Sequence, residues 1–502
     1  MFSKILVANR GEIAVRVIRA CRELGVKSVA VYSDIDEHSI HVRMADEAVR
    51  IGEAPARNSY LSIDAIIGAA RKTGAEAIHP GYGFLSENPG FAERCEKEKI
   101  VFIGPSSDSM RLVGDKVASR EAAAGAGIPL TPGMTGKSTD PARCVKAAKE
   151  IGFPVILKAS AGGGGKGMRI IRDERELESA VEAGMREALS AFGDASVYLE
   201  KYIEKPRHVE FQILADKYGN AVHLFERECS IQRRHQKIIE ESPSVIVDDD
   251  LRNRMGRTAL KVVEISGYSN AGTIEFLVDE NRNFYFLEVN ARLQVEHPVT
   301  ELVTGIDLVQ AQLRIAAGEK LWLNQADLRQ RGHAIECRIY AEDPENNFLP
   351  SAGRIDFMKE PSGPGIRHDC GVGSGSEVSV YYDPILSKLI AWAENRQLCC
   401  RKMAEALKNF PLIGIKTNIE FLHDIITHPA FTSGDLSTAF ISQYMADWSS
   451  KRDAAVEDLA LIAAAAHEML VKDKKTIGKV AAAQPSCWET LGEWRIGGQG
   501  TR

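Results

Sequence analysis

Several features that mark common protein classes are missing from this chain of 502 residues. No apolar run approaches the roughly 20 residues that a membrane-spanning helix needs, and the longest candidate, residues 459–466, is too short. The N-terminus has no basic segment followed by an apolar core, so we expect no secretory signal. The nine cysteines are scattered without a C-x-x-C pair, which favours buried thiols over disulfides or zinc. We therefore expect a cytoplasmic protein without a membrane-embedded part.

A surplus of positive charge is also absent. Lys and Arg total 63 against 69 Asp and Glu, which gives a formal net charge of -6 and argues against nucleic-acid binding. Hydrophobic residues at 44% and charged residues at 26% are typical of a globular protein. Because the chain is too long for one ordinary hydrophobic core, we expect about two to four domains.

The first part of the chain alternates predicted strands and helices. Residues 4–8 and 26–32 are short apolar runs, and residues 11–24 between them carry apolar side chains at helical spacing. The same alternation continues to about residue 103. This order predicts a doubly wound parallel sheet covered by helices, in an α/β domain over residues 1–114. A dinucleotide-binding loop would need three glycines, of which only Gly11 is present, so that function is not favoured.

Beyond this domain the pattern changes to paired strands. Residues 209–215 and 221–226, with a turn between them, predict an antiparallel pair. Residues 333–445 combine short apolar runs with Gly and Pro, which predicts a mixed β domain. The last stretch, residues 446–502, contains an Ala-rich segment at 458–470 that we expect to be helical, followed by a polar tail.

A run of four glycines within residues 155–171 is the first strong signal for chemistry. Consecutive glycines let backbone N–H groups close around an anion, and the apolar runs on either side predict a hairpin that forms a mobile lid over phosphates. The motif is not a Walker A loop, which would need Gly at Ser160 and Ser or Thr at Gly167. A glycine run alone is more often a linker, but the flanking Lys158 and Lys166 favour phosphate binding.

Two adjacent predicted strands carry three oxygen ligands. A short loop joins them after Asp279, which we place opposite Phe284. Glu275 then falls opposite Glu288, and Asn290 points to the same face. Opposed carboxylates on a half-buried sheet repel unless a cation lies between them, and oxygen ligands suit Mg²⁺ or Mn²⁺. The alternative is a solvated sheet face that happens to carry charges.

The segment after these ligands is suited to an anion. Arg292 continues the same alternation, so its guanidinium falls beside the metal, placed for bidentate binding of a planar anion such as bicarbonate. Glu296 suits a general base toward the proton of that anion. Residues 232–237 add positive charge, although such a run is more often a solvated surface. His208 is open to the same objection, because a lone histidine on a strand is more often structural.

Taken together, these motifs resemble the biotin carboxylase family, the ATP-grasp ligases that begin the carboxylation of acetyl-CoA, propionyl-CoA or pyruvate. The resemblance covers about residues 2–445. It is carried in order by residues 9–14, 79–88, the glycine run, 233–237, 288–298 and 336–339. It implies an N-terminal domain over 1–114, an ATP-grasp domain over 115–332 with a lid at about 133–203, and a C-terminal domain over 333–445. Residues 446–502 would be an extension that docks a partner, or a helix with a loose end.

The resemblance also implies roles for individual residues. For ATP it implies Lys116, Lys158, Gly164, Gly165, Glu200, Lys201, Tyr202, Ile203, His208, His235, Glu275 and Glu288. For Mg²⁺ or Mn²⁺ it implies Glu275, Glu288 and Asn290. For bicarbonate and biotin it implies Lys237, Arg292, Gln294, Val295, Arg338, Tyr82 and Gly83. The implied catalytic residues are Arg292, Glu296, Arg338 and Lys237, with Glu296 deprotonating bicarbonate and Arg338 stabilising negative charge on biotin.

No Ala-Met-Lys-Met biotin attachment sequence occurs in the chain. The resemblance therefore implies biotin held on a separate carrier protein, a separate carboxyltransferase subunit, and a homodimer. Two other functions stay open. Another ATP-grasp ligase, such as a carbamoyl-phosphate or amino-acid ligase, would share the glycine run and the hairpin, but is not expected to carry both residues 79–88 and 292–298. A non-catalytic nucleotide-binding regulator is expected to have lost one of the acidic or arginine site residues, and all are present.

Overall fold

The computed structural model describes residues 1–160, 168–450 and 458–467, together with Met469. It separates into one unit from Met1 to Trp448 and a second from Ser449 to Arg502. The glycine run of the predicted lid, with Gly164 and Gly165, lies outside the described residues. In the described ranges no helix combines the length and apolar character that crossing a bilayer requires. The eight cysteines in the same ranges are free and buried, as predicted.

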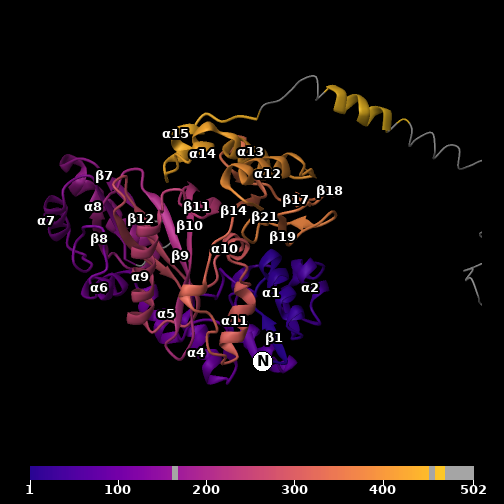
Figure 1. Ribbon diagram of the computed structural model, residues 1–502, viewed down its shortest axis with the longest axis horizontal. Helices are drawn as coiled ribbons and strands as arrows, with labels where there is room; N and C mark the ends of the chain where they lie inside the picture. Colours follow the sequence, from indigo (N-terminus) through magenta and orange to yellow (C-terminus); the bar gives the residue numbers. More distant parts are fainter. Residues whose placement is uncertain (161–167, 451–457, 468, 470–502) are drawn as a thin grey trace, which may run out of the picture. The chain divides into compact units, whose positions relative to one another are not determined.

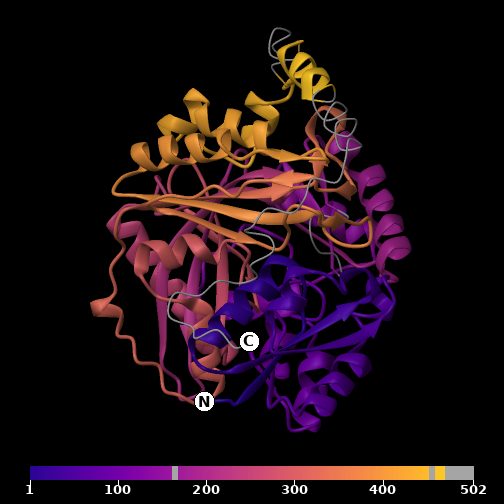
Figure 2. The same cartoon turned by 90° about the vertical axis from the view of Figure 1, so that its right-hand side faces the viewer.

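A parallel sheet of five strands forms the N-terminal part. Its order is β3-β2-β1-β4-β5, with β1 (Lys4–Val7), β2 (Lys27–Ser33), β3 (Glu47–Gly52), β4 (Ala77–His79) and β5 (Val101–Phe102). Ile5 packs with helix α1 (Gly11–Glu23) on one face. Leu6 packs with α3 (Ile63–Thr73) and α4 (Pro89–Lys97) on the other. Helices cover both faces (Figure 2), so the predicted doubly wound sheet is confirmed.

A second, smaller sheet contains the strands on either side of the glycine run. β6 (Val155–Ala159) pairs in antiparallel fashion with β7 (Arg169–Ile171) and with β8 (Val197–Lys201). Apolar side chains of this sheet pack on α7 (Pro141–Ile151) and α8 (Glu174–Phe192). The two strands of the predicted hairpin are therefore confirmed.

The largest sheet has eight antiparallel strands in the order β13-β12-β9-β10-β11-β14-β21-β19. They are β9 (Arg207–Ala215), β10 (Ala221–Arg233), β11 (Gln236–Ser242), β12 (Asn270–Val278), β13 (Phe284–Asn290), β14 (His333–Tyr340), β19 (Ile366–Cys370) and β21 (Ile385–Ala393). The predicted pairing of residues 209–215 with 221–226 is confirmed by β9 and β10. Because β11 pairs with β14, one sheet continues across residue 333. The predicted domain boundaries stay predictions.

The two faces of this sheet differ in chemistry. In β9 the residues from Val209 to Ala215 at odd positions are apolar, and they pack with α9 (Asp249–Ser266). The even positions from His208 to Gln212 are polar and lie on the opposite face, because side chains alternate along a strand. On that polar face Arg227 of β10 donates to Thr300 of α10 (His297–Thr304) at 3.0 Å. The alternation thus separates a core face from a face that can carry chemistry.

Helices cover the part of the large sheet that contains β14 and β21 (Figure 1). α12 (Arg396–Lys408), α13 (Ile419–Thr427), α14 (Pro429–Ser433) and α15 (Phe440–Tyr444) contribute to one core with the apolar face of β14 and β21. The other helices are α2 (Ile40–Met44), α5 (Ser107–Gly114), α6 (Lys116–Gly125) and α11 (Leu308–Ala316). Short strands complete this region: β15 (Glu342–Asp343), β16 (Leu349–Pro350), β17 (Gly353–Arg354), β18 (Phe357–Met358), β20 (Glu377–Val378) and β22 (Leu412–Ile413). In the second unit residues 458–467 form the expected helix.

Candidate active site

A row of charged side chains crosses four strands on the polar face of the large sheet. The register pairs Glu288 with Glu275, Glu275 with Glu210, and Glu210 with Arg227. Directly opposed residues share a face, so these four side chains lie side by side. Arg227 is fully buried and donates to Glu210 Oε1 at 2.6 Å. The predicted opposition of Glu275 and Glu288 is confirmed, and Glu210 extends it.

The pairing of Glu275 with Glu288 depends on a β-bulge. At the turn Val278 lies opposite Phe284, a place predicted for Asp279, so the predicted register was wrong by one residue there. A register shift before Glu288 inserts one extra residue into β13. The bulge cancels the earlier error and turns the side chain of Glu288 to the polar face.

Lys237 of β11 lies at the centre of the site with three carboxylates around it. Its Nζ is 2.5 Å from Glu210 Oε2, 2.7 Å from Glu275 Oε1 and 2.8 Å from Glu296 Oε1. Burial alone would lower the pKa of Lys237, but the three carboxylates raise it well above its usual range. Lys237 therefore stays charged and brings the predicted metal ligand Glu275 close to the predicted base Glu296.

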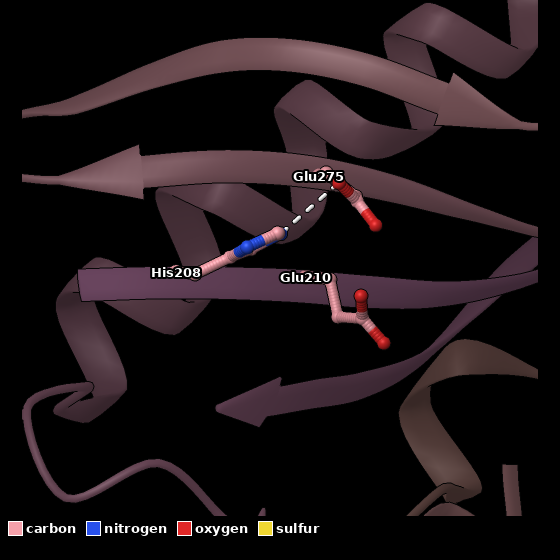
Figure 3. Close-up of side chains that lie close together, drawn as sticks. All are labelled: His208, Glu210 and Glu275. Carbon is pink, nitrogen blue, oxygen red and sulfur yellow. Dashed lines mark ion pairs between the residues drawn. The ribbon is translucent and has the colours of Figure 1, made fainter. Parts of the chain in front are cut away.

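His208 holds the other oxygen of Glu275. Figure 3 shows His208 and Glu210 on one strand and Glu275 on its neighbour. His208 Nε2 is 3.0 Å from Glu275 Oε2. Burial raises the pKa of Glu275, but Lys237 and His208 outweigh it and bring the pKa below its usual value. Glu275 is thus an ionised, buried carboxylate with the Lys237 ammonium on one oxygen and the His208 imidazole on the other.

Glu296 lies between Lys237 and Arg338. Arg338 donates from Nη2 to Glu296 Oε2 at 2.9 Å and from Nε to Glu240 Oε1 at 2.6 Å. Burial raises the pKa of Glu296, but the ion pairs with Lys237 and Arg338 hold it well below its usual range. Glu296 is therefore ionised, as a general base must be.

Arg292 connects the metal-ligand strand to this cluster. Its Nη1 donates to Gln294 Oε1 at 2.8 Å and its Nη2 to Asn290 Oδ1 at 3.2 Å. Its Nε donates to Glu87 Oε2 at 2.9 Å, which ties it to the 79–88 motif. Gln294 Nε2 in turn lies 3.4 Å from Glu275 Oε1. The predicted bicarbonate residues and metal ligands are therefore neighbours.

The two lysines predicted to bind phosphates have carboxylate partners. Lys116 Nζ lies 3.2 Å from Glu288 Oε2, which adds it to the charged row. Lys158 Nζ lies 2.9 Å from Glu200 Oε2, and Thr131 donates to the same oxygen at 2.9 Å. The structure thus brings Lys116 to the metal ligands and leaves Lys158 on the small sheet with Glu200.

The other residues predicted for ATP lie around these lysines. Burial, with smaller contributions from Lys158 and His208, lowers the pKa of His235. Lys201 donates instead to backbone carbonyl oxygens at residues 152 and 153. The ring of Tyr202 faces the Arg172 guanidinium at 5.7 Å, and Ile203 is half-buried. Lys201 and Tyr202 therefore contact the small sheet and its flanks.

The residues predicted near the biotin ring lie on the N-terminal side of the site. The ring centroid of Tyr82 is 5.9 Å from Lys388 Nζ, and Gly83 has a left-handed φ of 67°. Lys388 also donates to the carbonyl oxygen of Val295 at 2.9 Å. Tyr82 and Val295 therefore share a buried neighbour.

Glu240 and Glu336 form a second carboxyl pair beside Arg338. They are directly opposed between β11 and β14, and both are fully buried. Both oxygens of Glu336 lack a hydrogen-bond partner among the described residues. Burial raises the pKa of Glu240 to about 7 and that of Glu336 well above its usual range. Burial therefore favours the protonated, uncharged form of Glu336.

Comparison with known proteins identifies the family. Family models described as biotin carboxylase, N-terminal domain, carbamoyl-phosphate synthase L chain, ATP binding domain, and biotin carboxylase C-terminal domain match residues 1–110, 115–324 and 336–443. The chain is 52% identical over 445 residues to biotin carboxylase 2 of Bacillus subtilis, covering 89% of this chain and 100% of that protein. It is 51% identical over 442 residues to biotin carboxylase of a Nostoc species, covering 88% and 99%. The chain belongs to the biotin carboxylase family.

Solved structures of biotin carboxylases share the fold. The biotin carboxylase domain of Hydrogenobacter thermophilus 2-oxoglutarate carboxylase, a dimer in complex with MgADP, ADP and bicarbonate, has a TM-score of 0.87 and 49% identity, covering 90% of this chain and all of that one. Biotin carboxylase from Campylobacter jejuni has a TM-score of 0.86 and 45% identity, covering 88% and 99%. The predicted fold class is confirmed, and so is the prediction of an ATP-grasp enzyme of the biotin carboxylase type.

The biotin carboxylase site also contains residues that the sequence analysis did not single out. They are Glu210, Arg227, Glu240, Glu336 and Lys388. For Glu210 a signal existed, because polar residues alternate with apolar ones along β9. Arg227 is paired with Glu210 on the neighbouring strand β9. For Glu240, Glu336 and Lys388 no local signal existed, since the residues opposite them come from strands far away in the sequence.

Proposed function

We propose that this chain carboxylates biotin, held on a separate carrier protein, with bicarbonate and ATP through carboxyphosphate. The reaction would be the first half-reaction of an acyl-CoA or pyruvate carboxylase. One observation supports it above all: Lys237 joins Glu275 and Glu296 at hydrogen-bond distance, with Arg292 and Arg338 beside them. The Hydrogenobacter domain was solved with MgADP and bicarbonate, which supports the same ligands here.

The donor set fits a divalent ion bound together with ATP. Glu275 and Glu288 are directly opposed, and Asn290 lies on the same strand as Glu288. The two carboxylates and the amide all offer oxygen atoms, which such an ion prefers as ligands. Lys116, already 3.2 Å from Glu288, would bind phosphate oxygens at this place, and Lys158 would do so from the small sheet with Gly164 and Gly165. Bound Mg²⁺ or Mn²⁺ would offset phosphate charge and polarise the γ-phosphate. The adenine and ribose would lie against residues 200–203, with His208 and His235.

Bicarbonate would bind between Arg292, Gln294 and Lys237, beside the Val295 backbone. Glu296 would accept its proton. The strong hold of Lys237 and Arg338 on Glu296 lowers its proton affinity, so the arrival of a second anion at Lys237 would weaken that hold and make Glu296 a better base. Two anions must meet here, and the surrounding cations offset their repulsion.

The deprotonated bicarbonate oxygen would attack the γ-phosphorus, forming an O–P bond as the bond to ADP breaks. Carboxyphosphate would then break down to carbon dioxide and phosphate. The released phosphate would take the proton of the biotin nitrogen, and that nitrogen would form the C–N bond to carbon dioxide. Arg338 would stabilise the charge on the biotin oxygen, with Tyr82 and Gly83 near the ring. A closed glycine lid would keep water from the labile intermediate.

The partners follow from the same proposal. Biotin would arrive on a carrier protein, and a carboxyltransferase subunit would use the carboxybiotin. We also propose a homodimer, supported by the dimer of the Hydrogenobacter domain. The chain is 52% identical over 448 residues to the human mitochondrial propionyl-CoA carboxylase alpha chain, and the match spans 62% of that protein. The carboxyltransferase subunit would select the final acyl acceptor.

The test is phosphate release from ATP, measured with and without bicarbonate and free biotin. We expect release to require bicarbonate and Mg²⁺ and to increase with biotin. Labelled bicarbonate should then appear on biotin or on an added carrier. Phosphate release that depends on neither bicarbonate nor biotin would count against the proposal and favour another ATP-grasp ligase.

A further inference from the structure

A buried lysine, which has no role in the proposed reaction, contacts the backbone of the segment that is proposed to bind bicarbonate. Lys388 of β21 has 0% of its side chain exposed, and it lies opposite Arg338 of β14 in register. Directly opposed residues point to the same face, so both cations reach toward the segment after β13. Arg338 donates to the Glu296 carboxylate, and Lys388 donates to the Val295 carbonyl oxygen at 2.9 Å. Two neighbouring cations thus hold two consecutive residues.

Lys388 also connects the 9–14 motif, which the proposed function leaves without a role, to the 79–88 motif. Its Nζ is 3.2 Å from Oε2 of Glu12, in the 9–14 motif, and 5.9 Å from the Tyr82 ring, in the 79–88 motif. Asp369 of β19 is its other opposed residue, with Oδ2 at 4.0 Å. Three segments far apart in the sequence therefore meet at one ammonium group.

A hydrogen bond to one carbonyl oxygen fixes a whole peptide unit. The peptide between Val295 and Glu296 is planar, so its C=O direction sets the Glu296 N–H and the Cα that carries its side chain. Glu296 is also the N-cap of α10, with φ −80° and ψ 11°. A tilt of this plane would move the backbone of the bicarbonate segment together with the carboxylate of the proposed base.

We propose that Lys388, oriented by Glu12, is a positioning residue that fixes the Val295–Glu296 peptide for bicarbonate. This inference rests on the proposed function. An ammonium group is buried only at a large cost unless it is paired, and Glu12 and Asp369 supply the opposite charge. Burial raises the pKa of Glu12 to about 7, with Lys388 as the strongest opposing influence, so the charge of Glu12 also depends on this pair.

A purely structural role predicts a different outcome. If Lys388 only neutralises Glu12, removing both charges together should restore the wild-type kinetics. If Lys388 holds the Val295 carbonyl, the double variant should keep the defect. Lys388→Met, Glu12→Gln and the double variant Lys388→Met/Glu12→Gln separate the two roles, because the double variant leaves no unpaired buried charge between these two residues.

Arg396→Met is a matched control. Arg396, whose side chain is 15% exposed, is also a cation that pairs with a glutamate, Glu241, at 2.7 Å and donates to a backbone carbonyl oxygen, that of Phe431, at 2.8 Å. Within the described ranges it contacts no residue with a proposed role in the reaction. The control reports the effect of losing such an anchor on folding alone.

The measurement is the bicarbonate dependence of ATP hydrolysis in the full chain, with thermal unfolding as a check. We expect Lys388→Met and the double variant to lose about tenfold to a hundredfold in kcat/KM for bicarbonate, as for a small misplacement of reacting groups, with an unchanged KM for ATP. Glu12→Gln should lose less, and Arg396→Met should keep the wild-type value. If Lys388→Met does not fold, the double variant carries the test.

Wild-type kinetics in the double variant, or an equal loss in Arg396→Met, would overturn the positioning role. These outcomes are distinct from a failure of the proposed function. In that case the wild-type chain itself would show no bicarbonate-dependent hydrolysis.

Discussion

At the scale of single residues, the role of Glu296 can be separated from its contribution to folding. Glu296→Gln removes the base while it keeps the size of the side chain, so we expect bicarbonate-dependent ATP hydrolysis to fall by about 10²–10⁴-fold. Glu241→Gln is the control, since Glu241 is equally buried on β11 but pairs with His333 and Arg396. Steady-state kcat of both variants is the measurement, and equal activity of Glu296→Gln and wild type would remove Glu296 from the reaction.

Glu336 gives a prediction about pH. In the unfolded state a glutamate loses its proton at about pH 4.3. A glutamate whose pKa is raised in the folded state keeps its proton there to a higher pH. Between the two pKa values the folded state binds more protons, so stability falls as pH rises. Since burial raises the pKa of Glu336, wild type should lose stability relative to Glu336→Gln between pH 5 and 8. Thermal unfolding of both proteins across this range is the measurement, and parallel curves would contradict the protonated state.

At the scale of strands, Arg227 stabilises the charged row from within the sheet. Its guanidinium donates to Glu210, to the Gln212 amide oxygen at 2.7 Å and to Thr273 Oγ1 at 3.0 Å. Arg227→Met would leave Glu210 with Lys237 alone, and breaking such a buried pair costs about 3–5 kcal/mol. Denaturant unfolding measures the loss.

Arg252→Met is the comparison for Arg227→Met. Arg252 is 17% exposed and pairs with Glu226 at 2.8 Å, so water can replace part of that interaction. We expect a clearly smaller loss in the free energy of unfolding. Similar losses in the two variants would argue against a special role for the row.

Strands and helices with a clear local period could be predicted from the sequence. The parallel sheet followed from alternating apolar segments, and the hairpin of β12 and β13 followed from two apolar strands with a turn between them. The bulge in β13 could not be predicted, because the extra residue has no composition signal of its own. The right pairing of Glu275 with Glu288 came from a turn register that was wrong by one residue and a bulge that compensated for it.

The pairs that complete the site depend on contacts between distant segments. The opposition of Glu240 and Glu336 exists only because β11 pairs with β14, about a hundred residues later in the chain. The same holds for Lys388, which reaches Val295 only because β21 lies beside β14. A single sequence shows such residues as isolated charges, so their burial could not be inferred before the strand order was known.

At the scale of the whole molecule, the end of the first unit predicts where the chain can be shortened. Trp448 is its last residue. The Trp448 ring packs edge-on against Phe421 at 5.2 Å, and its Nε1 donates to Asp424 at 3.0 Å. A chain of residues 1–448 should therefore keep its thermal stability. A chain that stops at residue 445, where the sequence had placed the boundary, should lose about 2 kcal/mol from the missing ring.

The same shortened chain tests the proposed role of the tail. Residues 1–448 contain the whole candidate site, so bicarbonate-dependent hydrolysis with free biotin should be unchanged. Leu459 and Ile462 are three residues apart on the helix at 458–467, so they share one face, and an apolar helix face is what a partner's groove buries. Co-purification with the carrier and carboxyltransferase subunits should be lost in 1–448 and in the full chain with Leu459→Gln and Ile462→Gln. If the shortened chain still retains its partners, the docking surface lies within the first unit, because residues 449–502 are then dispensable for assembly.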